Sequence, residues 1–232
     1  MAGFMDVSAA ARELRVDPSR VRVLIAGGVL GAEKLGGRWL VDPESVARLL
    51  RSPRSSGRPF AARNAWALIF RASGEPVEWL EQMAMWKVNQ ALRLQGIVAL
   101  GPRLNRRASV LSYRAHPGEL RHLSEREGVV RSGISAAGEH SLDLVSPSEL
   151  DVYVCEDRVA ELVAEHALSP VGLSGANVVL RSVPAGAWHL QGRDVAPLAA
   201  VALDLASGSD SRSVRVAKKV LKGLDAARAS GS

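Results

Sequence analysis

Apolar residues recur at helical spacing in three short segments of the first fifty residues. The first segment presents one apolar face, formed by Val7, Ala10, Ala11 and Leu14. Ser8 is the expected N-cap of this helix, because a serine hydroxyl can accept a hydrogen bond from an unpaired amide at a helix start. The third segment begins at Asp42-Pro43 and continues to about residue 50. The pattern predicts a small unit of short helices.

The second helix is predicted to begin at Asp17-Pro18, where proline lacks an amide that the first helical position does not use. Its apolar residues, which have the spacing of a buried face, are Val21, Leu24 and Ile25. Its outward positions are Ser19, Arg20, Arg22 and Val23. A helix with an apolar inner face and arginines on its outer face is built as a recognition helix, which reads base edges or contacts phosphates.

Two strands are predicted over residues 29–35 and 38–41, on either side of Gly36-Gly37. A glycine pair tolerates the positive φ angles of a two-residue hairpin turn. Lys34 and Arg38 flank this turn. The hairpin is therefore expected to form a wing whose cations contact a phosphate backbone.

These features follow one another in the run VSAAARELRVDPSRVRVLIAGGVLGAEKLGGRWLVDPESVARLL. At these residues the chain resembles the excisionase and MerR-like winged helix-turn-helix family. The resemblance implies a domain over residues 1–50 that binds double-stranded DNA. The expected DNA-contacting residues are Ser19, Arg20, Arg22, Val23, Lys34, Arg38, Arg51, Arg54 and Arg58. The alternative is a small helical packing module whose arginines are only solvated.

Charge favours a polyanionic partner. The chain carries 30 Lys plus Arg and 24 Asp plus Glu, a net charge of +6, and residues 1–64 hold 11 basic and 6 acidic residues. Thus +5 lies in this segment and +1 remains for the other 168 residues. Neutralising phosphates releases counterions and favours binding. No run approaches the roughly 20 apolar residues of a membrane span, and no signal-peptide pattern or cysteine pair occurs. We expect a cytoplasmic, nucleoid-associated protein.

Residues 51–58, RSPRSSGR, lack apolar periodicity and combine proline, serine and glycine with three arginines. They predict a flexible basic linker whose arginines can touch phosphates. An ordinary solvated connector is the alternative.

Residues 59–125 are predicted to be mainly helical, with helices over 60–71 and 77–94. Trp79, Met83 and Trp86 follow i, i+4, i+7 spacing, which predicts burial in the core rather than a ligand site. Residues 101–107, GPRLNRR, form a second basic segment open to a DNA or protein contact.

Short apolar runs over 151–155, 178–183 and 187–190 predict strands in residues 126–232. Helices are expected after Asp157, from Pro197, and after Asp210, which is the expected cap of the last helix. The fold class is therefore α+β: an N-terminal winged helix-turn-helix, a helical middle segment and a C-terminal mixed α/β domain. Arg212 is expected to pair with an acid, and Arg181 to join either a buried polar network or a protein-contact face.

Three phrases within residues 59–232 resemble the antitoxins of the AbiE abortive-infection class of type IV toxin-antitoxin systems. They are RPFAARNAWALIF, SGANVVLRSVP and VAPLAAVALDLASGSDSRSVRVAKKVLKGL. The resemblance implies an antitoxin that represses its own operon, with a nucleotidyltransferase-like toxin as partner. The N-terminal domain resembles the excisionase type more than the usual antitoxin winged helix.

Catalytic signatures are missing from the sequence. The five histidines have no metal-ligand spacing, and no nucleophile elbow, phosphate loop or dinucleotide fingerprint occurs, so no metal or cofactor is expected. Gly133 and Ser135, followed by Asp143 or Asp151, come nearest to a nucleotidyltransferase pattern. Tyr153 occupies the place of the second carboxylate on that strand face, and a single acid cannot hold two metal ions. We therefore expect a protein that is not an enzyme.

Together these features predict a sequence-specific DNA-binding transcriptional regulator and, more specifically, an autorepressing antitoxin. A stand-alone phage or bacterial repressor and an excisionase-like architectural factor are the alternatives. Because one domain of fifty residues reads only a short half-site, two copies are expected, through a homodimer or cooperative assembly at operator repeats.

Overall fold

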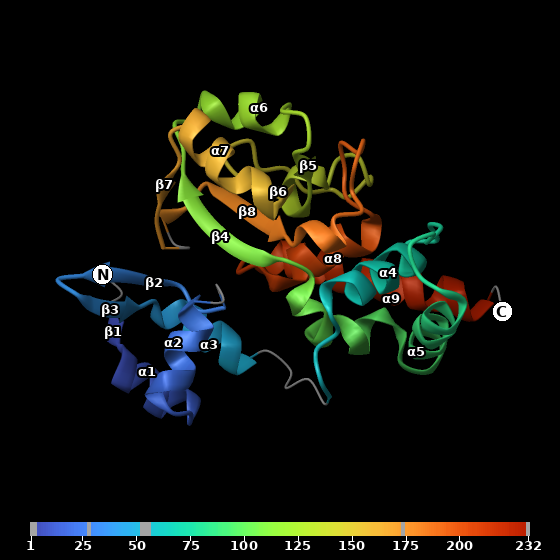
Figure 1. Cartoon of the computed structure of the whole chain (residues 1–232), viewed down its shortest axis with the longest axis horizontal. Helices are drawn as coiled ribbons and strands as arrows, with labels where there is room; N and C mark the ends of the chain where they lie inside the picture. Colours follow the sequence, from blue (N-terminus) through green and yellow to red (C-terminus); the bar gives the residue numbers. More distant parts are fainter. Residues whose placement is uncertain (1–3, 27–28, 52–56, 173–174, 231–232) are drawn as a thin grey trace.

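The computed structural model describes residues 4–26, 29–51, 57–172 and 175–230. The N-terminal unit packs its helices against a small antiparallel sheet of strand order β1-β3-β2 (Figure 1). Its elements are β1 (Met5–Asp6), α1 (Val7–Leu14), α2 (Pro18–Ala26), β2 (Ala32–Leu35), β3 (Arg38–Val41) and α3 (Pro43–Arg51). The buried residues at its centre are Ala10, Ala11, Leu14, Val21, Leu30, Val41 and Val46.

The predicted hairpin is confirmed, since Leu35 pairs with Arg38 around Gly36-Gly37, whose φ angles are +56° and +81°. The prediction of Ser8 as N-cap is wrong. Asp6 caps α1 by accepting a hydrogen bond from Ala9 N at 2.6 Å, and Ser8 lies inside the helix. Asp6 also belongs to β1, which pairs with β3, so this pairing places the cap two residues earlier than the local pattern suggests.

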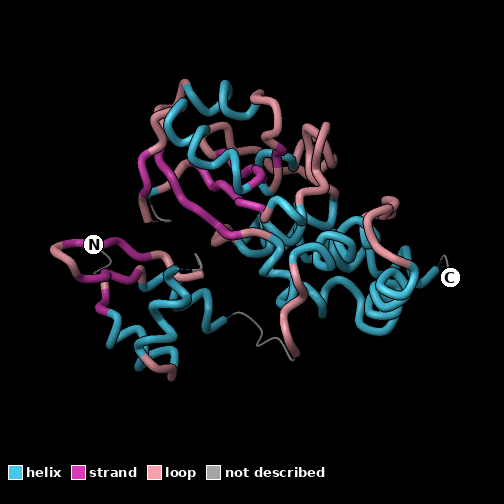
Figure 2. The backbone as a smooth tube through the Cα atoms, in the orientation of Figure 1, coloured by secondary structure: helices cyan, strands magenta, loops and turns pink. Residues whose placement is uncertain are grey.

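In the larger part of the chain, helices pack around a mixed sheet (Figure 2). The sheet has the order β5-β6-β8-β4-β7, in which β6 and β8 are parallel and the other pairs antiparallel. Its strands are β4 (Ser109–Arg114), β5 (Val130–Arg131), β6 (Leu150–Cys155), β7 (Ser169–Pro170) and β8 (Val178–Val183). The α-helices are α4 (Ala62–Ala72), α5 (Gln82–Leu100), α6 (Glu119–Ser124), α7 (Val159–Glu165), α8 (Leu198–Ser207) and α9 (Ser211–Ser230). The 3-10 helices are η1 (Gly101–Arg107), η2 (Gly133–Ala136), η3 (Glu156–Arg158) and η5 (Ala185–Ala187).

The two faces of the central strands pack against different helices, because side chains alternate along a strand. Val152 and Leu180 pair across β6 and β8 and join Leu162 of α7 in one apolar cluster. Tyr153, the next residue of β6, joins Trp66 of α4 in a second cluster that also includes α8. The α+β class is therefore confirmed.

Several local predictions for this part hold, and others are wrong. Asp210 caps α9 by accepting a hydrogen bond from Ser213 N at 2.7 Å, and Arg212 pairs with Asp143 at the same distance. The strand predicted over 187–190 is absent, because η5 ends at Ala187 and Leu190 is buried without strand pairing. A short apolar run fits a buried turn as well as a strand.

The predicted core packing of Trp79, Met83 and Trp86 is wrong for two of the three. Met83 and Trp86 are 65% and 56% exposed. The helix begins only at Gln82, so Trp79 lies before it and stacks on His189, with ring centroids 3.8 Å apart. Without Trp79 in the helix, the spacing that suggested a buried stripe has no basis. Val88 and Leu92 form its buried face instead.

A break in α5 is stabilised by α9. Gly96 has φ +73°, and beyond it Ile97 N and Val98 N donate to the carboxylate of Asp225 at 2.6 and 3.2 Å. A Cβ atom at position 96 would lie 2.6 Å from Asp225 Oδ2. The glycine therefore serves both the left-handed backbone and the close approach of the capping carboxylate.

A charged network lies inside the larger part of the chain. Arg181 of β8 donates to both oxygens of Asp151 of β6 at 2.6 and 2.7 Å, and also lies 3.0 Å from Asp204 of α8. Asp204 also bonds Arg107, at the end of η1, which donates to Tyr153 Oη at 2.8 Å. Both guanidiniums and both carboxylates are buried.

The network is compensated and well bonded. Tyr153 Oη and Ser132 Oγ donate to the two oxygens of Asp204 at 3.0 and 2.5 Å. Burial alone would lower the pKa of Arg181, but the charges of Asp151 and Asp204 raise it above its ordinary value. Two permanent cations therefore face two carboxylates, and every charge has a partner of opposite sign, as burial requires.

We expect Asp204→Ala to lower the free energy of unfolding by about 3–5 kcal/mol, because it leaves a buried guanidinium without compensation. Urea denaturation at neutral pH measures the change. The control is Asp143→Ala, which breaks the exposed pair with Arg212 and should leave the midpoint unchanged. Equal, small effects of both substitutions would contradict a structural role for the network.

Gly96→Ala is expected to destabilise the protein by about 1–3 kcal/mol, since it combines a positive φ with a clash against Asp225. Gly223→Ala in α9 is the matched control: no atom lies within 4 Å of its added Cβ. It should stabilise the protein by about 0.5–1 kcal/mol through helix propensity. Thermal unfolding of both variants measures whether each substitution raises or lowers stability. Stabilisation by both would show that Gly96 is not required at the α5 break.

Candidate nucleic-acid interface

The outer face of α2 is the strongest candidate for contact with DNA. Ser19, Arg20, Arg22 and Val23 are all exposed, as the sequence predicts. Val21 is fully buried between them and anchors the helix. The structure thus brings the four predicted residues together on one exposed surface, over the first two turns of the helix.

Asp17 fixes the start of that surface. Its carboxylate accepts a hydrogen bond from Ser19 N at 2.7 Å. Hydrogen bonding from Ser19 lowers the pKa of Asp17, so the cap stays ionised at neutral pH. Among the described residues, neither Arg20 nor Arg22 forms a salt bridge. Their guanidiniums are therefore available for guanine edges or phosphates, the groups that arginine binds with two parallel hydrogen bonds.

The wing presents one predicted cation on each of its faces. Lys34 pairs with Trp39, and Leu35 pairs with Arg38, across the antiparallel strands. Directly opposed residues point to the same face of a hairpin, while successive residues alternate. Lys34 and Arg38 therefore lie on opposite faces, and both are exposed. They can contact separate phosphates on the two sides of the wing.

The wing tip also carries an apolar residue that the sequence pattern alone did not single out. Leu35 is 71% exposed beside the glycine turn, and Lys34 Nζ lies 5.8 Å from the centroid of the Trp39 ring. The half-buried Trp39 thus supports the stem of the wing while its tip projects. A leucine directly before a tight turn, where a polar residue is usual, is the signal that marks this position.

The linker arginines are placed only in part. Arg51 ends α3, but its side chain lies outside the described residues, as does the whole of Arg54. Arg58 is exposed, and its carbonyl accepts a hydrogen bond from Arg103 Nε at 3.1 Å. The DNA contacts expected of these three arginines stay predictions.

The residues that come nearest to a nucleotidyltransferase pattern make structural contacts. Gly133, Ser135 and Asp151 do meet, since Asp151 N donates to Ser135 Oγ at 2.9 Å and an added Cβ on Gly133 would collide with the Asp151 carboxylate. Asp143 lies elsewhere, with a side chain that is 99% exposed. Arg181 donates to both oxygens of Asp151, so this carboxylate belongs to the buried network.

The described part of the chain contains no group of three or more His, Cys, Asp or Glu side chains arranged to hold a metal ion. Among the helices that the structure describes, none is long and apolar enough to cross a membrane.

Comparison with known proteins agrees with the geometry of the N-terminal unit. No curated protein and no solved structure matches the chain. The antitoxin resemblance of residues 59–232 is thus left without a matching relative. A family model described as a helix-turn-helix domain matches residues 4–54. The matched region spans β1 to α3 and includes α2 and the wing. The N-terminal unit thus has both the sequence pattern and the geometry of a helix-turn-helix domain.

Proposed function

We propose that this protein is a sequence-specific DNA-binding transcriptional regulator. The observation that carries the proposal is the exposed pair Arg20 and Arg22 on α2, inside a matched helix-turn-helix domain whose inner face is packed. The first two turns of a recognition helix are the part that reaches base edges in the major groove. Arginine is the residue most often used there, through two hydrogen bonds to guanine.

The wing supports the same mode of DNA binding. In this mode α2 enters the major groove while Lys34 and Arg38 contact the sugar-phosphate backbone beside it. Backbone contacts fix the orientation of a protein on the duplex, and base contacts select the sequence. Arg20 and Arg22 are thus assigned mainly to selectivity, and the wing cations to affinity.

Two copies of the domain are proposed to act together. A single domain of this size contacts a short half-site, so useful discrimination in a genome needs a second half-site. A homodimer or cooperative binding at operator repeats supplies it. Double-stranded promoter DNA is the partner in either case.

The finer proposal is that of an autorepressing antitoxin, which is supported by the three AbiE-like phrases in residues 59–232. A nucleotidyltransferase-like toxin encoded beside this gene, neutralised by co-expression of the protein, would support it over a stand-alone repressor. Strong bending of DNA at clustered sites would instead favour an excisionase-like architectural factor. In each case we propose that the protein acts by binding rather than catalysis, because Arg181 engages both oxygens of Asp151.

The double substitution Arg20→Ala/Arg22→Ala should weaken binding to the protein's own upstream promoter DNA by about 30-fold or more, from about 1 kcal/mol or more per contact. Its ratio of promoter affinity to unrelated-DNA affinity should fall as well. Fluorescence anisotropy with both DNAs measures these quantities. The control Arg93→Ala/Arg121→Ala removes the same charge from exposed positions elsewhere and should keep the ratio. Promoter selectivity that survives in the first variant would show that α2 does not read the DNA.

Lys34→Gln and Arg38→Gln should act differently. Each is expected to weaken promoter and unrelated DNA alike and to reduce the slope of log affinity against log salt by about 0.9. Because the two side chains lie on opposite faces of the wing, their effects should add. Lys87→Gln on α5 is the single-charge control. A wing variant that keeps the wild-type salt slope would exclude its cation from the backbone contact.

A further inference from the structure

The charge of this chain lies at its two ends. Residues 1–64 carry +5, residues 65–210 hold 13 basic and 17 acidic side chains, and residues 211–230 hold six basic and one acidic. The middle is therefore −4 and the last helix, α9, is +5. The net charge of +1 counted for residues 65–232 is therefore the sum of an acidic segment and a basic helix. The net charge of that helix, α9, equals that of residues 1–64.

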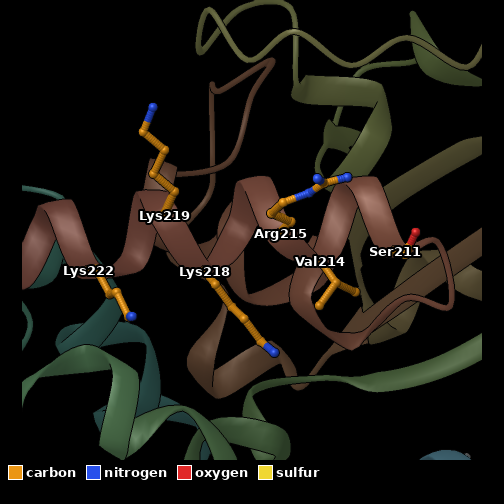
Figure 3. Close-up of a pocket in the computed structure, with 6 residues that line it drawn as sticks. All are labelled: Ser211, Val214, Arg215, Lys218, Lys219 and Lys222. Carbon is orange, nitrogen blue, oxygen red and sulfur yellow. The ribbon is translucent and has the colours of Figure 1, made fainter.

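Four of the six basic residues of α9 gather on one face. Arg215, Lys218, Lys219 and Lys222, here called the α9 stripe, are all exposed. At about 100° per residue they span about 100° of the helix circumference, and they extend about 10 Å along its axis. Figure 3 shows their side chains extending from this helix. The opposite face packs inward through Ser213, Ala217 and Leu221.

The stripe is not neutralised within the described residues. Arg212 pairs with Asp143, and Asp225, the one acid of α9, is occupied in capping the broken α5. None of the four stripe cations forms a salt bridge with a described carboxylate. Four like charges so close together repel one another, which an anionic ligand relieves.

The stripe borders a shallow surface depression that is open to solvent. The depression has a volume of about 570 Å³, and its other lining residues are Ser211 and Val214 (Figure 3). Ser211 adds a hydroxyl at the start of the helix. The lining thus offers four cationic head groups on aliphatic stems, a hydroxyl and the side chain of Val214.

This chemistry fits the phosphate backbone of duplex DNA better than a protein surface or a single-stranded nucleic acid. Protein-binding surfaces place aromatic and apolar residues at their centre, and single-stranded nucleic acids are held by stacking on aromatic rings. Residues 211–230 contain no aromatic residue, and the stripe borders only Val214 as an apolar group. Lysines and arginines without such a centre suit contacts that neutralise phosphates regardless of sequence.

We propose that the α9 stripe is a second DNA-binding site, which holds the phosphate backbone of the duplex whose bases α2 reads. The site rests on the proposed function, and it adds affinity without selectivity. The duplex is then held by two basic elements, one near each end of the sequence, and the acidic segment lies between them in the sequence.

The test uses the full chain with Arg215, Lys218, Lys219 and Lys222 all changed to Gln. Promoter and unrelated DNA should both bind more weakly, by similar factors. The slope of log affinity against log salt should fall by about 3.6, which is about 0.9 for each phosphate that is no longer neutralised. The slope of the pair Lys218→Gln/Lys222→Gln should fall by about half as much. This milder variant keeps the test valid if the fourfold change perturbs folding.

The matched control changes Lys87, Arg93, Arg121 and Arg126 to Gln, which removes the same charge from exposed positions outside α9. It should keep most of the wild-type slope. If the wild-type protein binds its promoter selectively but the α9 and control variants have equal salt slopes, this proposal alone is wrong. An acidic protein would then be the expected partner of the stripe. Wild-type protein that binds no DNA would overturn the proposed function and this site together.

Discussion

The larger part of this structure depends on one constraint: two buried guanidiniums must keep two buried carboxylates beside them. Arg107 and Asp204 are 97 residues apart in the sequence, and Asp151 and Arg181 are 30 apart. Their bonds join η1, β6, β8 and α8 at a single point. Because an unpaired charge inside a protein is far more costly than a gap in apolar packing, the network restricts how the helices can sit on the sheet. Trp66 of α4 joins the same point, donating from Nε1 to the carbonyl of Arg107 at 3.2 Å.

That constraint also engages the residues nearest to a catalytic pattern. Gly133, Ser135 and Asp151 come together much as a nucleotide-transferring site would need, yet the network engages the carboxylate. The Gly133 backbone approaches Asp151 so closely that only glycine fits, and Ser135 accepts a hydrogen bond from its amide. These contacts position β6 against η2. The residues proposed to contact a partner, on α2, the wing and α9, lie outside this network and are exposed.

The N-terminal unit could be predicted from sequence because its determinants are local. Asp17-Pro18 starts α2, Gly36-Gly37 closes the hairpin, and Asp42-Pro43 starts α3, each within a few residues of the structure that it specifies. The exceptions are contacts made over a distance. Asp6 replaces Ser8 as the cap where β1 pairs with β3. The exposure of Met83 and Trp86 follows from where α5 starts, and the partners of Arg181 follow from strand pairing and the position of α8. Spacing along one segment carries no information on such partners.

The distribution of charge separates affinity from selectivity in the proposed DNA complex. A basic helix-turn-helix alone would bind DNA through a few phosphates and a short half-site, with an affinity that physiological salt strongly reduces. A second cationic element in the same chain adds contacts that need no further sequence information, since phosphates recur along every duplex. Residues 65–210, with a net charge of −4, add no net attraction for the phosphates. In the proposed complex, selectivity comes from two arginines of α2, and part of the affinity comes from elsewhere in the molecule.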